Sequence, residues 1–361
     1  MNKKSISSVE LTAIVEELQF LVKGKFTQIY HQEKRELLLQ LHASGKGKLL
    51  LKIIPGKYVC FTKTKQSQLR PTGFCMLLRK YIGNGFIRSI KQQGAERILV
   101  MEIERKETYY LIFELFSKGN IILTDKDYTV IGALDQNTWK NRTIRTRYPY
   151  VFPEVRVNWK KITPKQLKEL LQKSEKKNLA TALATEVGLG GLYAEEVCLK
   201  ATVDKTVLPP EVSAVQVKSL IAAIDEIHKA LKKPTGNIYE NEITPFILEG
   251  KKPLKTVTSY TSALDLLKPF QVTSPYEKKI ATIGRMIGRQ EEALNNLQKK
   301  IDLNKQKGEL IYGQYQPLSK LLSIVKTLRE KKTWNDVGTE LKKEKKITQV
   351  NLKKKSVTIE L

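Results

Sequence analysis

The spacing of hydrophobic residues in segment 5–125 is first helical and then strand-like, and the same change occurs a second time. Apolar side chains in segment 9–21 mostly follow helical spacing, and Gly24 ends that segment. Short β-rich runs follow as far as Lys63, and turn residues such as Pro55 separate them. This order predicts an opening amphipathic helix and then an antiparallel sheet.

The same two patterns recur in the next part of the chain. Pro71–Tyr81 is apolar and unbranched with a basic end, as expected of a short helix. Strand character returns in four further segments, which are residues 87–90, 97–103, 109–116 and 120–123. Residues 1–155 are therefore expected to form one α+β domain, and the prolines of Tyr148–Pro153 mark its end because proline opposes both helix and central strand.

Helical patterns dominate the rest of the chain. Residues 156–272 are expected to form a helical region with a connecting segment, and Thr163 before Pro164 predicts the start of one helix. Apolar positions in residues 273–311 step alternately by three and four, which is the period of one arm of a coiled coil. Residues 312–361 are expected to form a small α/β middle segment that stops before a returning arm. An unpaired seam of this kind also allows two copies of the chain to associate.

The charge of the chain favours a polyanionic partner. Its 64 Lys and Arg residues exceed its 37 Asp and Glu residues and give a net charge of +27. The excess is spread over all parts of the chain, which is typical of a long surface that follows RNA or a ribosome. Solubility, or a thermophilic or halotolerant lineage, would also account for the excess.

Composition argues against several other classes of protein. The three cysteines and three histidines have no paired metal-ligand spacing, so we expect no metal, no other cofactor and no disulfide framework. No apolar run approaches the roughly 20 residues that span a bilayer, and a cytoplasmic location is expected. The sequence also lacks a phosphate-binding Gly-Lys-Ser/Thr loop and a Ser-His-Asp pattern, so we predict no catalytic residues.

A glycine-rich segment, Val187–Ala194, follows the helix-hairpin-helix pattern. In such a unit Gly188 permits the tight turn, and Gly190 removes the side chain that would block a phosphate. Backbone amides at the turn hold a phosphate without reading sequence. A plain packing hairpin remains the alternative, because Glu195 and Glu196 follow at once and would repel a phosphate.

Three motifs connect the chain with a known family. They are Phe74–Lys80, Gly94–Ile98 and Glu114–Asp125. Together they closely resemble the N-terminal domain of the NFACT proteins, the ribosome quality-control factors called RqcH in bacteria and archaea and NEMF in animals. The resemblance extends over nearly the whole chain and implies an N-terminal domain similar in fold to the formamidopyrimidine glycosylases.

The resemblance also implies a function. NFACT proteins bind the large ribosomal subunit obstructed by peptidyl-tRNA, recruit alanyl-tRNA, and support untemplated addition of residues to the stalled chain. The expected partners are therefore tRNA, in particular alanine tRNA, and the obstructed large subunit. Family members typically continue through a returning coiled-coil helix into another RNA-binding domain, which this sequence does not include. A truncated chain and a naturally short homologue would account for this equally well.

Glu96 and Arg97 are the first candidate tRNA-binding residues. They match an Asp-Arg pair that the family needs for tRNA recruitment, with an acid that is one methylene longer in this chain. Arg97 suits a phosphate or an exposed base, and a carboxylate accepts hydrogen bonds from base amino groups. A surface ion pair at the entrance of a strand is the alternative.

Two further basic groups are candidates for RNA contacts. Arg79 and Lys80 close a predicted helix, where they either complement the helix dipole or bind a phosphate of tRNA. A second cluster is either solvated or in contact with RNA backbone, and it comprises Lys140, Arg142, Arg145 and Arg147. Trp139 lies beside this cluster and is a candidate for base stacking.

Two other functions remain as alternatives. Fold similarity suggests a DNA glycosylase or lyase, but the chain begins with Met1-Asn2 in place of the N-terminal proline nucleophile, and the zinc-finger cysteines of those enzymes are absent. An adhesin is the second alternative, because some bacterial members of the family have been named fibronectin-binding proteins.

Overall fold

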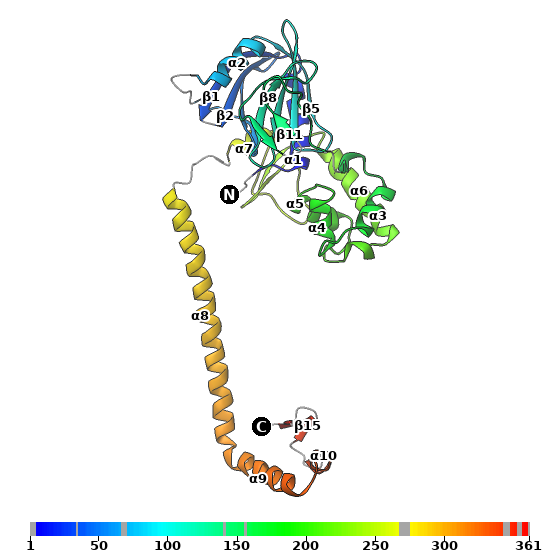
Figure 1. The fold of residues 1–361 in the computed structure, drawn as a ribbon, viewed down its shortest axis with the longest axis vertical. Helices are drawn as coiled ribbons and strands as arrows, with labels where there is room; N and C mark the ends of the chain where they lie inside the picture. The colour runs from blue at the N-terminus through cyan, green and yellow to red at the C-terminus, as the bar shows by residue number, and fades with distance from the viewer. Residues whose placement is uncertain are drawn as a thin grey trace. The chain divides into compact units, whose positions relative to one another are not determined.

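A computed structural model describes residues 5–33, 35–65, 71–139, 142–154, 157–266, 275–341, 347–351 and 356–359. The chain divides into two compact units, residues 1–271 and 272–361, and each is described by itself. Figure 1 shows the sheet and the group of helices α3 to α6 in the first unit, and the long helix α8 in the second.

An antiparallel sheet forms the centre of the first unit. Within the described residues its nine strands follow the order β4-β3-β2-β1-β5-β6-β7-β8-β9. The strands are β1 (Lys25–Glu33), β2 (Glu36–Ala43), β3 (Gly47–Ile54), β4 (Tyr58–Phe61), β5 (Phe86–Gln92), β6 (Ile98–Glu104), β7 (Thr108–Glu114), β8 (Asn120–Thr124) and β9 (Val130–Ala133). These strands confirm the β-rich runs expected from the sequence and the predicted α+β class.

The sheet consists of two meanders that meet at a short junction. Strands β1 and β5 share one ladder pair, Lys25 with Phe86. Backbone hydrogen bonds flank that pair, from Phe26 N to Gly85 O at 2.9 Å and from Ile87 N to Gly24 O at 2.9 Å. Every other neighbouring pair in the sheet joins strands that are consecutive in the chain.

Two helices of the first unit match the helices expected near the N-terminus. Helix α1 (Ser8–Leu18) packs on β5 and begins at Ser7, whose side chain caps the helix together with Glu10. Helix α2 (Gly73–Ile82) packs on β1 and is capped by Thr72. A 3-10 turn, η1 (Gln19–Leu21), extends α1 up to the start of the sheet.

The second half of the first unit is helical, with two small sheets. Its elements are β10 (Asn137–Trp139), β11 (Arg142–Ile144), η2 (Trp159–Lys161), α3 (Pro164–Gln172), α4 (Leu179–Thr185), α5 (Gly191–Lys200), η3 (Pro209–Glu211), α6 (Ala214–Ala230), β12 (Gly236–Ile238), β13 (Ile243–Thr244), β14 (Lys255–Val257) and α7 (Tyr260–Asp265). Helix α3 begins at Thr163 with Pro164 in its first turn, as predicted.

One hydrophobic core joins the sheet to these helices. Buried side chains of α1, the sheet, η2 and helices α3 to α7 belong to the same cluster, with Trp159 and Tyr193 among its largest members. Helix α7 closes the unit by packing against β4, β12 and α1. Apolar side chains from before and after residue 155 are therefore buried in the same core.

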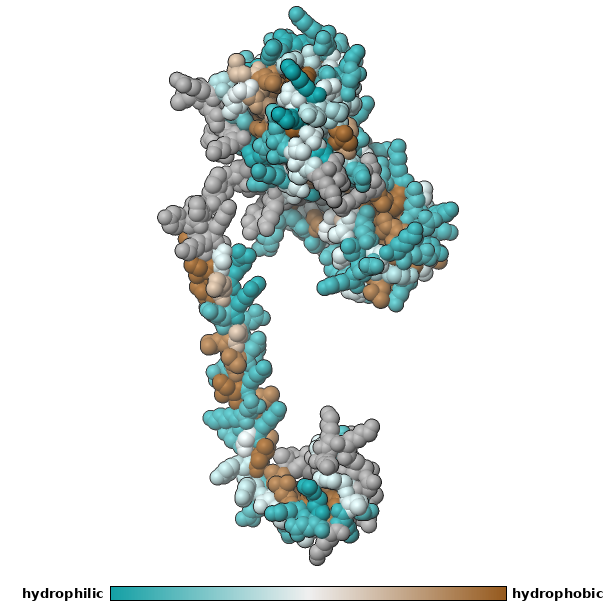
Figure 2. All heavy atoms as spheres, viewed as in Figure 1, coloured by the Kyte–Doolittle hydropathy of each residue, from teal (hydrophilic) through white to brown (hydrophobic). Residues whose placement is uncertain are grey.

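The second unit contains a long helix and a small α/β module. Its elements are α8 (Pro275–Gly313), α9 (Tyr315–Lys331), α10 (Trp334–Leu341), β15 (Ile347–Asn351) and β16 (Ser356–Ile359). Figure 2 shows hydrophobic side chains exposed along α8, and they include Ile280, Ile283, Ile287, Leu294, Leu297 and Ile301. With Gln290 between Ile287 and Leu294, these positions alternate in steps of three and four. The coiled-coil arm stays a prediction.

Within the described residues, no helix is long and apolar enough to span a membrane.

Candidate functional site

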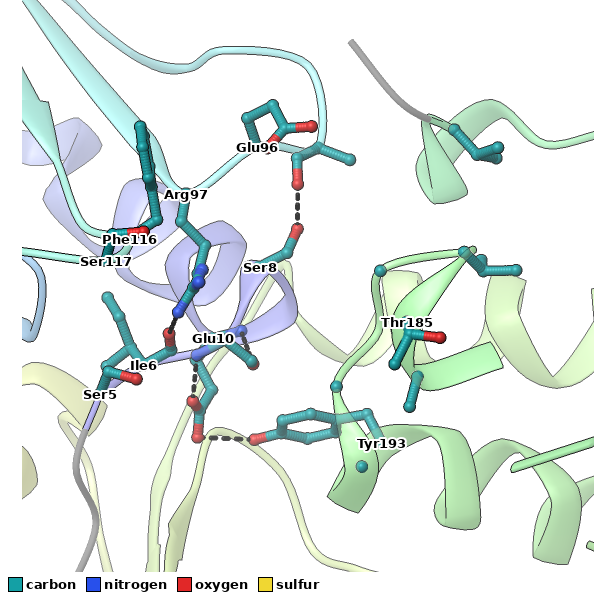
Figure 3. Close-up of a pocket in the computed structure, with 18 of the residues that line it drawn as sticks. Ser5, Ile6, Ser8, Glu10, Glu96, Arg97, Phe116, Ser117, Thr185 and Tyr193 are labelled. Carbon is teal, nitrogen blue, oxygen red and sulfur yellow. Dashed lines mark hydrogen bonds between the residues drawn. The ribbon is translucent and has the colours of Figure 1, made fainter. Parts of the chain in front are cut away.

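A cleft of about 1340 Å³ brings together motifs that are far apart in the sequence. The N-terminal end of α1, the turn between β5 and β6, and the turn between α4 and α5 line it (Figure 3). Five of the predicted site residues are among its lining residues, namely Glu96, Arg97, Arg142, Gly188 and Gly190. The family motif and the glycine-rich hairpin therefore contribute to the same surface.

Arg97 lies at the entrance of β6 and directs its guanidinium into this cleft. Its backbone is fixed by a hydrogen bond from Leu115 N to Arg97 O at 2.8 Å. Its Nη1 donates to Ile6 O at 3.4 Å (Figure 3). Burial lowers the pKa of Arg97, and the charge of Glu96 offsets part of that effect. Among the described residues it forms no ion pair, so an anionic ligand would restore the electrostatic stabilisation that burial removes.

Glu96 precedes Arg97 in the same turn. The turn is held by a hydrogen bond from Glu96 N to Gln93 O at 2.9 Å, and Gly94 occupies the left-handed region with a φ of +54°. The Glu96 carboxylate is half-buried and has no hydrogen-bond donor within the described part of the chain. It is therefore available to accept hydrogen bonds from a ligand or to orient Arg97.

Gln92 holds this turn in place through its side chain, and this role was not predicted from the sequence. Its Nε2 donates to Glu96 O at 2.9 Å. Its Oε1 accepts from Thr12 Oγ1 at 2.7 Å and from Lys160 Nζ at 2.6 Å. Thr12 lies on α1 and Lys160 on η2, both far from Gln92 in sequence. Periodicity and motif spacing therefore cannot predict these hydrogen bonds.

Ser8 supports the turn from the opposite side. Its hydroxyl donates to Ala95 O and accepts a hydrogen bond from Trp159 Nε1 at 2.9 Å. Both Ser8 and Trp159 are buried. The turn that presents Arg97 is thus fixed to α1 and to η2 before any ligand binds, which is the preorganisation that a binding site requires.

Two helix N-termini meet at the cleft. Helix α5 begins at Gly190, which has a φ of 83° and a ψ of 156° and offers no side-chain cap. A Cβ placed on Gly190 would lie 3.5 Å from Cβ of Ser7, the N-cap of α1. The first backbone N–H groups of α5 therefore lack a side-chain acceptor, and such groups are suited to an anion.

The turn between α4 and α5 has the geometry that its glycines predict. Gly188 has a φ of +87° in addition to the left-handed φ of Gly190. Both conformations favour glycine, because a side chain would be strained there. The two helices pack against each other across this turn.

A buried pair, Glu10 and Tyr193, forms part of the cleft lining. The Tyr193 hydroxyl donates to Glu10 Oε1 at 3.0 Å, and Ser7 N donates to Glu10 Oε2 at 2.7 Å (Figure 3). Burial and the nearby Glu10 raise the pKa of Tyr193 well above its ordinary value, so its hydroxyl stays protonated. The pair connects α1 to α5 and was not predicted from the sequence.

Arg142 reaches the cleft with its charge already balanced. Its Nη2 lies 2.5 Å from Glu114 Oε1, and its Nε donates to Val151 O at 2.8 Å. Tyr150 completes the group through a hydrogen bond to Glu114 at 2.9 Å and a ring 4.8 Å from the guanidinium. Both charged side chains are largely buried, so Arg142 has a structural role in addition to lining the cleft.

The other predicted basic residues that the structure describes do not line the cleft. Arg79 donates from Nε to Ile29 O at 2.8 Å at the end of α2, where Lys80 is exposed. Arg145 and Arg147 are exposed beyond β11 and are absent from the cleft lining. Lys140 lies outside the described residues.

Within the described part of the chain, no group of three or more His, Cys, Asp or Glu side chains is placed to hold a metal ion.

Comparison with known proteins identifies the family. The family described as NFACT N-terminal and middle domains matches residues 7–360. The archaeal Rqc2 homolog aRqcH of Methanocaldococcus jannaschii is 31% identical over 365 residues, which cover 92% of this chain and 53% of that protein. The human ribosome quality control complex subunit NEMF is 25% identical over 386 residues, which cover 93% of this chain and 35% of that protein.

A solved structure supports the fold. The N-terminal part of the fibronectin/fibrinogen-binding protein from Streptococcus suis has a TM-score of 0.60 and 22% sequence identity, and the match covers 73% of this chain and 98% of that one. The chain spans about half the length of aRqcH and about a third of the length of human NEMF. With a family match over almost every residue, the chain belongs to the NFACT family.

Proposed function

We propose that this chain is a non-enzymatic factor of ribosome quality control that binds tRNA and the obstructed large ribosomal subunit. In this role it recruits tRNA, in particular alanyl-tRNA, for untemplated tailing of stalled chains in the cytoplasm. Family membership supports the proposal, as do the names of the relatives aRqcH and NEMF. Peptide-bond formation is left to the ribosome, and the protein supplies positioned RNA-binding groups.

One observation carries the proposal, namely the convergence of Arg97 and the N-terminus of α5 on a single cleft. A guanidinium and uncapped backbone amides are both donors that suit phosphate oxygens. The cleft volume of about 1340 Å³ exceeds the 300–1,000 Å³ or so of common small-molecule pockets. A segment of a nucleic acid fits such a space better than a single metabolite does.

The net charge of +27 also supports RNA binding, through electrostatic attraction that acts at longer range. An excess of basic residues attracts RNA without regard to sequence, and this attraction weakens steeply as salt increases. Contacts of Arg97 and Glu96 inside the cleft would add a preference that depends on the RNA. Binding is therefore expected to have a salt-sensitive part and a part that requires the cleft.

A salt series with matched arginine variants tests the proposal. The affinity of the full chain is measured for alanine tRNA, for another tRNA and for duplex DNA, with wild type, Arg97→Ala and Arg88→Ala. Arg88 is a suitable control because it lies on β5 outside the cleft lining, pairs with Glu104, and changes the net charge equally when it is replaced.

We expect wild type and Arg88→Ala to prefer alanine tRNA. Arg97→Ala is expected to lose about 10- to 100-fold in affinity for that tRNA, as when a hydrogen bond to a charged group is removed. Weak, salt-sensitive binding to all three nucleic acids should persist. The proposal would fail if wild type bound all three nucleic acids equally, or if Arg97→Ala and Arg88→Ala lost the same affinity. Either result would indicate a general basic surface only.

A further inference from the structure

A small hairpin beside the cleft carries an exposed aromatic side chain and two exposed arginines. Strands β10 and β11 and the turn at residues 145–148 form this feature, which we call the rim hairpin. A hydrogen bond from Gln136 Nε2 to Thr146 Oγ1 at 3.3 Å ties the turn to the start of β10. The strands and the turn therefore form one connected surface feature.

Strand register places Trp139 beside Arg142, which lines the cleft. Trp139 is paired directly with Arg142, and paired residues of an antiparallel ladder point to the same face. Arg142 lines the cleft and donates to the carbonyl of Val151, another lining residue. Ile144, on the same face, is fully buried, whereas Trp139, at the other end of the three-residue ladder, is 50% exposed.

Trp139 has a free aromatic surface. Among the described residues it forms no ring contact, cation-π contact or hydrogen bond, in contrast to the buried Trp159, whose Nε1 donates to Ser8. Half of a large apolar side chain thus remains in contact with water. Nucleobases stack on surfaces of this kind, and stacking needs a base that is not paired within a duplex.

Arg147 occupies a backbone conformation that favours glycine. Tyr148 N donates to Arg145 O at 3.1 Å and closes the turn, in which Arg147 has a φ of 69°. A second hydrogen bond, from Arg147 N to Val130 O at 2.8 Å, holds it there. An arginine at a left-handed position is strained, and strain of this kind is often retained at functional sites. Arg145 and Arg147 are both exposed and form no ion pair within the described residues.

We propose that the rim hairpin binds an unpaired segment of RNA, with a base stacked on Trp139 and phosphates bound by Arg145 and Arg147. The inference rests on the proposed function, since it places a second contact for the same RNA beside the cleft. Trp139 at one end of the short ladder and the two exposed arginines beyond its other end complement a single strand of RNA, which carries repeated negative charges and flat, apolar bases. Duplex RNA offers the charge alone.

Binding of a single-stranded RNA 12-mer and of the same sequence in a duplex tests the inference. The full chain is compared with Trp139→Ala, Trp139→Phe and Arg147→Gly. Lys23→Gly is a matched control, because Lys23 is exposed, has a φ of 70°, and loses the same charge on a backbone that glycine also favours. Intrinsic fluorescence gives a second readout, and the difference between wild type and Trp139→Phe isolates Trp139 from the other two tryptophans.

We expect Trp139→Ala to weaken binding of the single strand by about 5- to 20-fold, with a much smaller effect of Trp139→Phe and little change for the duplex. The fluorescence of Trp139 should be quenched when the single strand binds. Arg147→Gly should weaken binding about fivefold while its melting temperature stays the same or rises, because glycine adopts a φ of 69° without strain. Lys23→Gly should bind as wild type does.

Wild-type affinity of both Trp139→Ala and Arg147→Gly, with no fluorescence change, would overturn the inference. Equal weakening of single strand and duplex by Trp139→Ala would overturn it as well, because stacking discriminates between them. Arg97→Ala separates the two proposals. If this variant keeps the wild-type preference for alanine tRNA while Trp139→Ala weakens binding of the single strand, the cleft proposal fails and the rim hairpin stands.

Discussion

The hydroxyl of Tyr193 on α5 donates a hydrogen bond to Oε1 of Glu10 on α1 at 3.0 Å, in the lining of the cleft. The Tyr193 side chain is 1% exposed and Glu10 is 2% exposed. The bond connects the helix that follows the glycine hairpin with the helix that supports the Arg97 turn. The alignment of the two helix N-termini therefore depends on a contact between two buried side chains.

Replacing Tyr193 with Phe tests that dependence. We expect Tyr193→Phe to lower the free energy of unfolding by about 1–3 kcal/mol, because a buried hydrogen bond to a carboxylate is lost. Affinity for tRNA should fall too, since α5 loses its fixed position relative to α1. Urea denaturation and tRNA titration measure the two effects. Tyr312→Phe is the control, because Tyr312 is 84% exposed, and a loss of stability there would point to a general effect of the substitution.

Gly188 and Gly190 are expected to differ in function, although replacing either one would strain the backbone. Gly188→Ala and Gly190→Ala should each lower the free energy of unfolding by about 1–3 kcal/mol, because both positions have a positive φ. A methyl group at position 188 meets open space, whereas one at 190 lies 3.5 Å from Ser7 Cβ between the helix N-termini.

Affinity for tRNA should therefore fall about tenfold in Gly190→Ala, the loss expected for one hydrogen bond to a phosphate, and stay near wild type in Gly188→Ala. Thermal melts and a tRNA titration of both variants at one salt concentration provide the comparison. Equal tRNA affinities in the two variants would exclude a special role for the N-terminus of α5.

The Arg142–Glu114 pair is expected to matter for stability more than for RNA binding. Arg142→Met should cost about 3–5 kcal/mol of unfolding free energy, because it leaves the Glu114 carboxylate buried without its partner. The double variant Arg142→Met with Glu114→Gln should recover much of that loss. Denaturant titrations of wild type, both single variants and the double variant complete the cycle. Independent, additive losses would show that the two side chains do not interact in solution.

Lys160 should give the stability of the first unit a measurable pH dependence. Burial lowers the pKa of Lys160 to about 8, while Glu16 raises it in part. An unfolded lysine has a pKa of about 10.4, so the unfolded chain binds more protons than the folded chain between pH 8 and about 10.4. The contribution of Lys160 to stability is therefore lowest below pH 8 and rises across that window.

Comparison of wild type with Lys160→Met isolates this effect. Cys198, whose pKa burial raises to about 11, contributes the opposite trend at high pH, but it is present in both proteins. Unfolding free energies from pH 7 to pH 10 should rise more with pH, or fall less, in wild type than in Lys160→Met. Parallel pH profiles would mean that Lys160 titrates normally in the folded chain.

Much of the fold follows from local sequence pattern. The strands β1 to β8 and the helices α1 and α2 match the expected segments, because alternation of buried residues and the caps at Ser7 and Thr72 are local properties. The hairpin of β10 and β11 was not predicted. Each of its strands has three residues, too few for a periodic pattern to be recognised.

The site was predicted in part, and for the same physical reason. Glu96, Arg97 and the glycines were found by motif, and the structure places them around one cleft. Their supporting contacts with Gln92, Ser8 and Glu10 depend on tertiary packing between segments 68 or more residues apart, as in the bonds from Lys160 and Thr12 to Gln92. Charge clustering likewise failed to show that Arg142 is already paired with Glu114.

The junction between Lys25 and Phe86 has a consequence for how the chain folds. Strands β1 to β4 form one meander and β5 to β9 another, so nearly all pairing within each half is between neighbours in sequence. Such short-range pairing closes small loops and is kinetically favoured over distant pairing. We expect amide protons inside each meander to gain protection from hydrogen exchange early in refolding. Amides at the junction and in α7, which returns from more than two hundred residues away to contact β4 and α1, should follow later.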